Sequence, residues 1–320
     1  MKCFAICSWV LLLVVASNSA YTDEDPQVWL DRMSTAMSQM SYQGTFIYIS
    51  GGRMETMRIT HVADENGARE RLASVSGPER EVVRDATGVR WMSGEDESVV
   101  SDPATNWPMF LDQSFRGLSA KSDVYRLKLL DRKRIAEFTG QQLDIVATDD
   151  FRYGYSVWLE AESGLLLQWQ LNDKHGNSLA KLVFTELKIG TEVNQSELRA
   201  SHKKTDKAKT GLLVDTAVSA SIPRHWSPGW LPPGFHMMAS RAPQTGEKNG
   251  FQHQVYSDGI ASISLYLEPD DGAADSGLGL RQLGTSHIFG RKGNGVMVTV
   301  VGDVPAITVE KIAQSVDFSQ

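Results

Sequence analysis

The residues whose chemistry could support a reaction are few and scattered along the chain. The histidines lack the spacing of a metal site; they stand at positions 61, 175, 202, 225, 236, 253 and 287. Residues 154–158 place Ser156 after a glycine but lack the second glycine of a nucleophile elbow, and the sequence contains no phosphate-binding loop. Asp149 and Asp150 could form an acid–base pair. Adjacent turn residues point apart, however, so we expect two solvated carboxylates there, and the pattern predicts no enzyme, cofactor or metal site.

The sequence offers aromatic residues that could line a binding surface instead. The candidates for an apolar, lipid-binding groove are Phe46, Tyr48, Trp91 and Tyr155. The candidates for a partner-binding surface that faces a peptide are Trp230, Phe235, Tyr256 and Tyr266. A curved sheet lined with such side chains can hold an acyl chain or an extended peptide. For each residue the alternative is a place in the core, which is the more common role of a buried aromatic ring.

Most of the chain predicts antiparallel strands that would position these residues. Residues 42–92 read as five consecutive strands, because Gly, Asn-Gly and Gly-Pro turns separate short runs with partial alternation. Phe46 and Tyr48 should face one side, and Thr45 and Ile47 the other. Further strand-like runs extend to residue 190, and a meander of this length curls toward a barrel or half barrel. A preceding amphipathic helix, with Trp29, Met33, Met37 and Met40 on one face, should pack on the sheet.

A second unit follows a predicted linker. Residues 194–222 contain a short basic run and then small and polar residues, which is typical of a connection between domains. Strand candidates at 251–256, 262–267, 284–289 and 296–301 come next. The pattern after Pro305 predicts a closing helix. We therefore expect 21–193 to form a large β domain and 223–320 a small α+β domain. Residues 95–123 lack strand periodicity and could form a flap or a connector.

The first 20 residues predict a secretory signal peptide with cleavage near Ser19 or Ala20. Lys2 precedes an apolar run at 9–16, which small residues follow. The alternative, an uncleaved anchor, is disfavoured because a membrane span needs about 20 apolar residues. Cys3 and Cys7 would leave with the signal, so the mature protein would contain no disulfide. In a Gram-negative cell the expected location is the periplasm.

The bulk composition excludes two further classes. With 41% hydrophobic and 22% charged residues, the chain is that of a folded protein rather than a disordered one. A net charge of -7 argues against a nucleic-acid-binding protein, which usually carries a basic field.

Several short motifs follow one another along the chain at residues 42–48, 69–72, 77–84, 152–155, 159–160, 163–165, 230–235, 256–259 and 297–305. In this collinear order they resemble the RseB/MucB family of periplasmic regulators. Each motif alone is weak, but together they cover nearly all of the chain after the signal peptide. Residues 95–123 and 194–222 depart from the family pattern, which leaves their conformation open.

The resemblance implies both a fold and a function. The fold would be mainly β with α: a large LolA/LolB-like unclosed antiparallel β-barrel with helices across its opening, and a small C-terminal α+β domain. The partner would be the periplasmic segment of a membrane-spanning anti-sigma factor of the RseA/MucA type, which the protein would shield from proteolysis. It would thereby restrain an envelope-stress sigma factor of the sigma-E/AlgU type until lipopolysaccharide or a related lipid displaces it.

Two other functions stay open, as does homo-oligomer formation. The first is a periplasmic lipid or lipoprotein carrier of the same fold, although the simple carriers lack a second domain. The other is a periplasmic hydrolase without a recognisable motif.

Overall fold

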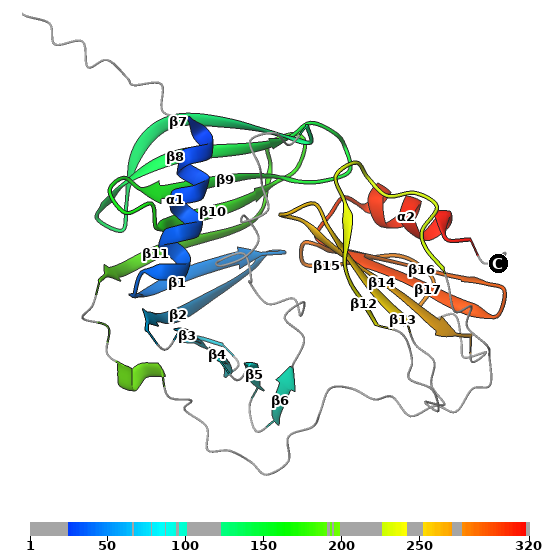
Figure 1. Cartoon of the computed structure of the whole chain (residues 1–320), viewed down its shortest axis with the longest axis horizontal. Coiled ribbons are helices and arrows are strands. Elements are labelled where there is room, and N and C mark those ends of the chain that lie inside the picture. The colour runs from blue at the N-terminus through cyan, green and yellow to red at the C-terminus, as the bar shows by residue number, and fades with distance from the viewer. Residues whose placement is uncertain are drawn as a thin grey trace, which may run out of the picture.

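The computed structural model describes residues 25–65, 67–77, 79–86, 88–93, 96–100, 123–190, 193, 195–198, 226–241, 252–270 and 277–317. These residues form two antiparallel sheets that lie side by side, each with one α-helix (Figure 1). We call residues 25–198 the N-terminal unit and residues 226–317 the C-terminal unit. The predicted signal peptide, most of 95–123 and most of the predicted linker lie outside the described residues.

The N-terminal unit is an 11-stranded sheet that does not close. Its strand order is β6-β5-β4-β3-β2-β1-β11-β10-β9-β8-β7, and its two end strands do not pair with each other. The strands are β1 Tyr42–Ser50, β2 Arg53–Asp64, β3 Gly67–Ser74, β4 Arg80–Asp85, β5 Gly88–Ser93, β6 Asp96–Val100, β7 Tyr125–Ile135, β8 Phe138–Ala147, β9 Gly154–Glu160, β10 Leu166–Asn172 and β11 Ser178–Ile189. The five strands predicted within 42–92 are confirmed. The sequence pattern missed β6 because no alternation marks it.

Helix α1, Pro26–Gln39, covers this sheet as predicted (Figure 1). The Asp25 side chain accepts a hydrogen bond from the Gln27 backbone N–H at 2.9 Å. Pro26 is tolerated in the first turn, because a backbone N–H at that position has no acceptor within the helix. Trp29, Met33 and Met37 are buried in one core with the strands. The Met-Trp stripe is therefore packing surface rather than a free binding face.

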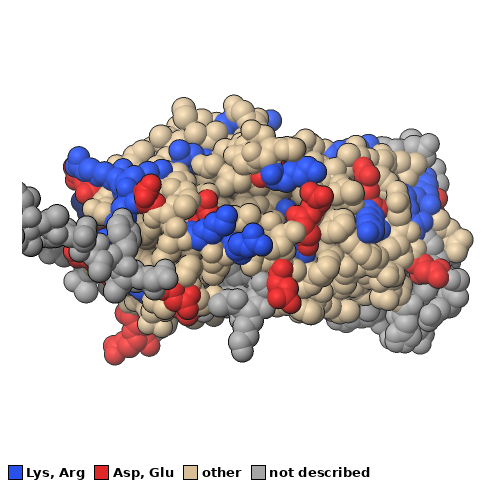
Figure 2. Space-filling model, turned by 90° about the horizontal axis from the view of Figure 1, so that it is seen from above, with Lys and Arg blue, Asp and Glu red and all other residues tan. Residues whose placement is uncertain are grey.

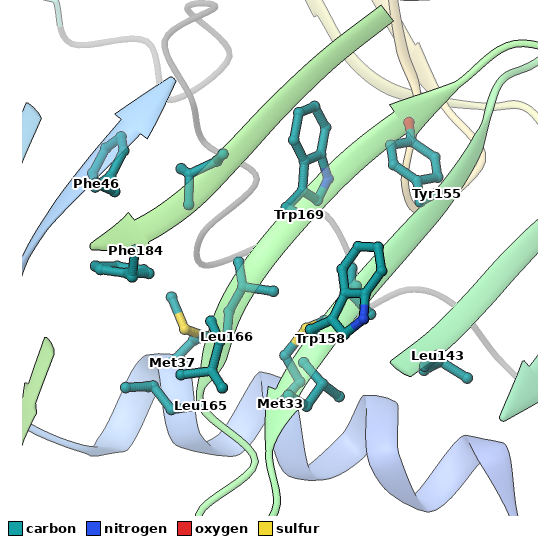
Figure 3. Packing of buried hydrophobic residues seen from close by; sticks show 14 of the residues in the cluster. Met33, Met37, Phe46, Leu143, Tyr155, Trp158, Leu165, Leu166, Trp169 and Phe184 are labelled. Carbon is teal, nitrogen blue, oxygen red and sulfur yellow. The ribbon is translucent and has the colours of Figure 1, made fainter. Parts of the chain in front are cut away.

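The core of the N-terminal unit contains several of the aromatic residues that the sequence singled out. Phe46 of β1 meets Phe184 of β11 edge-on, with ring centroids 5.5 Å apart. Tyr155 lies 6.1 Å from Trp169, and Met33 and Met37 of α1 lie near Leu165 and Leu166 (Figure 3). Burial of large apolar side chains from both α1 and the strands is the main force that holds the helix on the sheet.

The C-terminal unit is a six-stranded sheet with the order β12-β13-β14-β17-β16-β15. Its strands are β12 His236–Arg241, β13 Gln252–Ser257, β14 Ser262–Pro269, β15 Gly279–Leu283, β16 Ser286–Gly293 and β17 Val296–Gly302. Helix α2, Ala306–Ser315, contacts β16 and β17 directly after Pro305, as the sequence predicted. The sequence did not indicate the two edge strands, β12 and β15, because they are exposed on both faces and carry no alternation.

The predicted fold class is confirmed: the chain is mainly β, with an unclosed antiparallel sheet and a small α+β unit. One described part of the predicted linker is ordered. Residues Gln195–Leu198 form a 3-10 helix, η2, in which Glu197 accepts a hydrogen bond from the Gln43 side chain at 2.5 Å. The domain limits given above stay a prediction. Within the described parts of the chain, no helix is long and apolar enough to cross a membrane.

Candidate functional site between the two sheets

The connection between β8 and β9 positions a buried arginine at the boundary of the two units. Asp149 accepts a hydrogen bond from the Phe151 backbone N–H at 2.9 Å, which folds the connection into a tight turn. The Asp149 carboxylate also binds the Arg152 guanidinium through two bonds, at 3.1 Å from Nε and 3.0 Å from Nη2. This two-pronged contact fixes the guanidinium plane and aims its other edge at the C-terminal unit.

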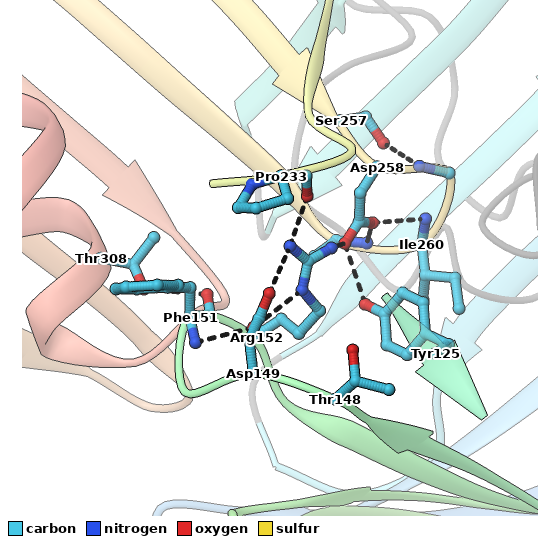
Figure 4. A network of polar contacts seen from close by, with 12 residues as sticks. Tyr125, Thr148, Asp149, Phe151, Arg152, Pro233, Ser257, Asp258, Ile260 and Thr308 are labelled. Atoms are coloured by element: carbon cyan, nitrogen blue, oxygen red, sulfur yellow. Dashed lines mark hydrogen bonds and ion pairs between the residues drawn. The ribbon is translucent and has the colours of Figure 1, made fainter. Parts of the chain in front are cut away.

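Asp258, in the turn between β13 and β14, completes the contact from the C-terminal unit (Figure 4). It pairs with Nη1 of Arg152 and accepts a hydrogen bond from the Tyr125 hydroxyl at 3.0 Å. Nη2 of Arg152 also donates to the Pro233 carbonyl oxygen at 2.5 Å. We refer to Tyr125, Asp149, Arg152, Pro233 and Asp258 as the Arg152 network.

Burial makes the Arg152 network energetically important. The side chains of Arg152 and Asp258 are both 0% exposed, and the second oxygen of Asp258 accepts the Ile260 and Ala261 N–H groups at 3.0 and 2.8 Å. Burial by itself lowers the pKa of Arg152, but the hydrogen bonds that Arg152 donates to Asp149 and the charge of Asp258 raise it above its usual value. Burial holds the pKa of Tyr125 well above 10. The guanidinium is therefore charged, and hydrogen bonds hold the side chains that contact it in place.

A second contact lies next to the network and is aromatic. Phe151 packs edge-on against Trp230 of the C-terminal unit at 4.9 Å between ring centroids. The Lys311 ammonium of α2 lies 4.0 Å from the Trp230 ring centroid and 4.9 Å from that of Phe151. The Thr308 hydroxyl donates to the Phe151 carbonyl oxygen at 2.8 Å. Helix α2 is thus tied to the β8–β9 connection.

A third contact joins the β1–β2 turn and Tyr153, the residue before β9, to the β15–β16 region. The Tyr153 hydroxyl lies 3.4 Å from Nδ1 of His287, which donates to the Val304 carbonyl oxygen at 2.8 Å. Burial raises the pKa of Tyr153 to about 12. A Cβ on Gly51 would lie 3.5 Å from the Cα of Gly284. The two units therefore touch at several separate places, which resists rotation of one against the other.

The predicted groove residues occupy different environments in the structure. Phe46 and Tyr155 are buried in the core of the N-terminal unit, and Tyr48 is partly buried beside it. Burial also raises the pKa of Tyr48, with a smaller contribution from Asp303 of the C-terminal unit. The Trp91 backbone lies in β5, and its side chain lies outside the described residues. For Phe46 and Tyr155, contact with a lipid chain therefore requires the core to open.

The predicted peptide-facing residues are not brought together on one surface. Phe235 and Tyr256 are buried in the core of the C-terminal unit, and Tyr256 donates to Gln254 at 2.7 Å. Tyr266 stacks on His253 at 4.3 Å on the sheet, while Trp230 packs between the units. Two of the four lie at the boundary with the N-terminal unit: Trp230 contacts Phe151, and the Phe235 ring centroid lies 5.2 Å from the Arg152 guanidinium carbon.

The expectation of two solvated carboxylates at the β8–β9 turn is wrong for Asp149. Asp150 is exposed and pairs with Lys174 at 3.3 Å, as expected for a surface turn. Asp149 instead holds Arg152, because the turn directs its carboxylate back onto the guanidinium. Sequence reasoning missed Arg152 and Asp258 as partners, since they lie 106 positions apart. Their presence in two of the family-like motifs was the available signal.

The geometry suits binding and the fixing of domain positions. Within the described residues, no group of three or more His, Cys, Asp or Glu side chains is arranged to hold a metal ion. The charged groups of the Arg152 network pair with one another, and each forms hydrogen bonds within the protein.

Comparison with known proteins places these features in a family. Residues 25–202 match the MucB/RseB N-terminal domain, and residues 220–317 match the MucB/RseB C-terminal domain. The Sigma factor AlgU regulatory protein MucB of Pseudomonas aeruginosa is 32% identical over 314 residues, covering 96% of this chain and 94% of that protein. The Sigma-E factor regulatory protein RseB of Escherichia coli is 27% identical, with the same coverage.

Solved structures agree with the sequence matches. MucB in complex with MucA(peri) superposes with a TM-score of 0.69 at 29% identity, covering 92% of this chain and all of that chain. The Pseudomonas aeruginosa MucA/MucB complex gives a TM-score of 0.71 at 28% identity, with 92% and 99% coverage. Because both domain models match and the similarity runs through both units, this chain belongs to the MucB/RseB family.

Proposed function

We propose that this protein is a periplasmic negative regulator of an envelope-stress sigma factor. It binds the periplasmic segment of a membrane-spanning anti-sigma factor and shields that segment from regulated proteolysis. One observation carries the proposal: the similarity to MucB, whose structure is solved in complex with MucA(peri), extends over both units. It acts by binding and catalyses no reaction. Export behind a cleaved signal peptide brings it to this partner.

The contacts between the units suggest how a bound segment is recognised. A peptide that touches both units needs them at a fixed separation and angle, and preorganisation lowers the entropy cost of binding. The Arg152 network, the Phe151–Trp230 contact and the Tyr153–His287 contact provide that rigidity. The arrangement drawn in Figure 1 is then the one that binds the anti-sigma segment.

Lipid release follows from linkage in this proposal. Lipopolysaccharide or a related lipid favours a second arrangement in which the core of the N-terminal unit opens to an acyl chain. A ligand shifts such an equilibrium only by its difference in affinity for the two states. Lipid must therefore weaken binding of the anti-sigma segment by the same factor by which that segment weakens lipid binding.

Fluorescence anisotropy tests the proposal directly. Mature protein, residues 21–320, is titrated into a labelled peptide from the periplasmic segment of the same cell's anti-sigma factor, and lipopolysaccharide is then added. We expect saturable binding that lipid reverses. Absence of peptide binding together with stable copurification of acyl chains would instead support a lipid carrier. Equal peptide affinity with and without saturating lipid would contradict the linkage, while leaving the regulator function intact.

A further inference from the structure

Strand β7 forms a strongly basic edge of the N-terminal sheet. It is the last strand in the sheet order, and only β8 pairs with it within the described residues. Between residues 126 and 134 it carries five basic side chains and one acidic side chain, whereas the whole chain has a net charge of -7. The basic residues are Arg126, Lys128, Arg132, Lys133 and Arg134. The β7 edge therefore carries a net positive charge, although the chain as a whole is negative.

This edge is exposed and also presents apolar groups. All five basic residues are exposed, and the Arg134 side chain is 76% accessible. Leu130 is 43% exposed, and Val146 of the adjacent β8 is 38% exposed. Figure 2 looks onto the side of the molecule that lies at the top of Figure 1, where Lys and Arg side chains lie exposed over the N-terminal unit. Cationic groups around accessible aliphatic side chains are typical of surfaces that lie on lipid headgroups.

The internal contacts of the strand leave most of its charge uncancelled. Arg132 donates to the neutral Gln141 side chain at 2.8 Å. The Lys133 ammonium lies 3.7 Å from the Trp158 ring centroid and 3.3 Å from the Gln168 side chain. Arg134 and Glu137 are 3.9 Å apart and both largely exposed, so that ion pair is weak.

We propose that the β7 edge docks the protein on an anionic phospholipid surface. The cations reach the headgroup phosphates, and Leu130 and Val146 enter the headgroup boundary. The contact is peripheral and reversible. It needs neither the proposed anti-sigma partner nor the opening of the core.

Addition of a peptide strand is the other interaction that an edge strand offers, and the geometry of β7 disfavours it. The β7–β8 register is irregular between Leu129 and Arg132, which breaks the regular row of donors and acceptors on which an added strand depends. Charged side chains along an edge also oppose strand pairing. A lipid surface makes no demand on backbone register.

The net negative charge of the molecule does not prevent this contact. Charges separated by more than about 8 Å are largely screened at physiological ionic strength. Groups at the β7 edge therefore feel the membrane strongly. The acidic residues beside them are Asp131 of β7 and Asp144 of β8, which stands opposite Lys128, and the five cations outnumber these two. Each cation near an anionic surface strengthens the association by about fivefold, so the binding should be salt-sensitive.

Co-sedimentation with lipid vesicles tests the proposal. Mature protein is mixed with vesicles of phosphatidylcholine alone and with vesicles that also contain phosphatidylglycerol, at low and at high salt. We expect binding only to the anionic vesicles and loss of that binding at high salt. A variant with Arg126→Gln, Lys128→Gln and Arg134→Gln should reduce the partition coefficient on the order of 100-fold.

A matched variant controls for total charge. Arg53→Gln, Lys188→Gln and Arg281→Gln remove three cations from exposed positions outside β7. This variant should partition like the unmodified protein, and circular dichroism should show both variants folded. Equal losses in the two variants, or no preference for anionic vesicles, would overturn the proposal. Binding of a polyglutamate peptide in place of vesicles would assign the edge to an acidic polypeptide instead.

Discussion

Arg152 shows at the scale of one residue how the two units are held together. Its guanidinium is fully buried between Asp149 and Asp258, so replacement by methionine leaves Asp258 buried without its cation. Removing one partner of a buried ion pair costs about 3–5 kcal/mol. We expect Arg152→Met to lower the free energy of unfolding by that order, measured by urea denaturation. Arg134→Met, at an exposed position, should change it by less than about 0.5 kcal/mol.

A double substitution separates the ion pair from the rest of the network. Asp258→Asn keeps an oxygen that can accept the Ile260 and Ala261 N–H groups but removes the negative charge. In the Arg152→Met background this substitution should cost less than it costs alone, with a coupling free energy of about 1–3 kcal/mol. Strict additivity of the two substitutions would show that the ion pair contributes nothing specific.

The raised pKa of Tyr153 predicts how the free energy of unfolding changes with pH. The folded protein releases the proton of Tyr153 at a pKa of about 12, whereas the usual pKa of tyrosine is 10.0. The contribution of Tyr153 to the free energy of unfolding is therefore complete below pH 10 and lost as the pH rises through about 12. The loss is about 2–3 kcal/mol.

Tyr153→Phe removes that contribution and should flatten the alkaline decline. Its cost should be largest near neutral pH and shrink above about pH 10, when denaturation is followed across this range. Tyr256→Phe provides a comparison within the C-terminal unit, because the pKa of Tyr256 is also raised to about 12 by burial. A cost for Tyr153→Phe that is independent of pH would contradict the assignment.

At the scale of elements, the β9–β10 turn holds α1 in place. Gly164 has φ +79°, and a Cβ there would lie 2.9 Å from the Cβ of Arg32. Arg32 itself donates to the Ala161 and Glu162 carbonyl oxygens at 3.0 and 2.7 Å. Gly164→Ala should therefore incur both a backbone cost of about 1–2 kcal/mol and a packing cost of about 1–3 kcal/mol.

Gly176 is a matched control for that substitution. Its φ of +82° is nearly the same, but no atom lies within 4 Å of the added Cβ. Gly176→Ala should lower the free energy of unfolding by the backbone cost alone, so the difference between the two variants measures the contact with α1. Equal losses in urea denaturation would mean that the helix moves aside freely.

The elements also show what local sequence can predict. Turns such as Ser50-Gly51-Gly52 and the alternation of Phe46 and Tyr48 predict strands, because both signals arise from neighbouring residues. Edge strands β12 and β15 escaped prediction, since exposure on both faces removes the alternation. The Arg152–Asp258 pair could not be predicted, because its two residues lie 106 positions apart in separate turns. No local sequence pattern indicates which turns will contact each other in the fold.

For a related reason, the sequence could not show where the candidate contact residues lie in the fold. Aromatic residue type alone does not say whether a ring faces a partner or the core. Tyr256 is a core residue of the C-terminal unit, whereas Trp230 contacts Phe151 of the N-terminal unit. Phe235 does both, because it belongs to the C-terminal core and its ring centroid lies 5.2 Å from the Arg152 guanidinium carbon. The difference depends on the strand face and on what packs against it, and both are properties of the tertiary fold.

At the scale of the whole molecule, the separate contacts between the units couple their positions. Each contact joins a loop or helix end of one unit to the other, and Ile260 of the C-terminal unit is buried in the core of the N-terminal unit. A change in the N-terminal core, such as the entry of an acyl chain, would therefore displace groups that the C-terminal unit contacts. This is the physical connection that the proposed competition between lipid and peptide requires.

A disulfide between the units gives the sharpest test of that connection. The only cysteines of the chain are Cys3 and Cys7, which the predicted cleavage removes, so an introduced pair can form without competition. Gly51→Cys with Gly284→Cys places the two residues at the close approach of the β1–β2 and β15–β16 turns, within reach of a disulfide. Non-reducing electrophoresis and mass spectrometry establish when the bond has formed.

The oxidised variant should bind the anti-sigma peptide as the unmodified protein does, because the bond holds the arrangement that binds it. Lipopolysaccharide should then fail to release the peptide from the oxidised protein, and reduction of the same sample should restore release. The reduced form controls for both substitutions, including their positive φ angles. Equal release from the oxidised and reduced forms would show that lipid acts within the N-terminal unit, without any movement of one unit against the other.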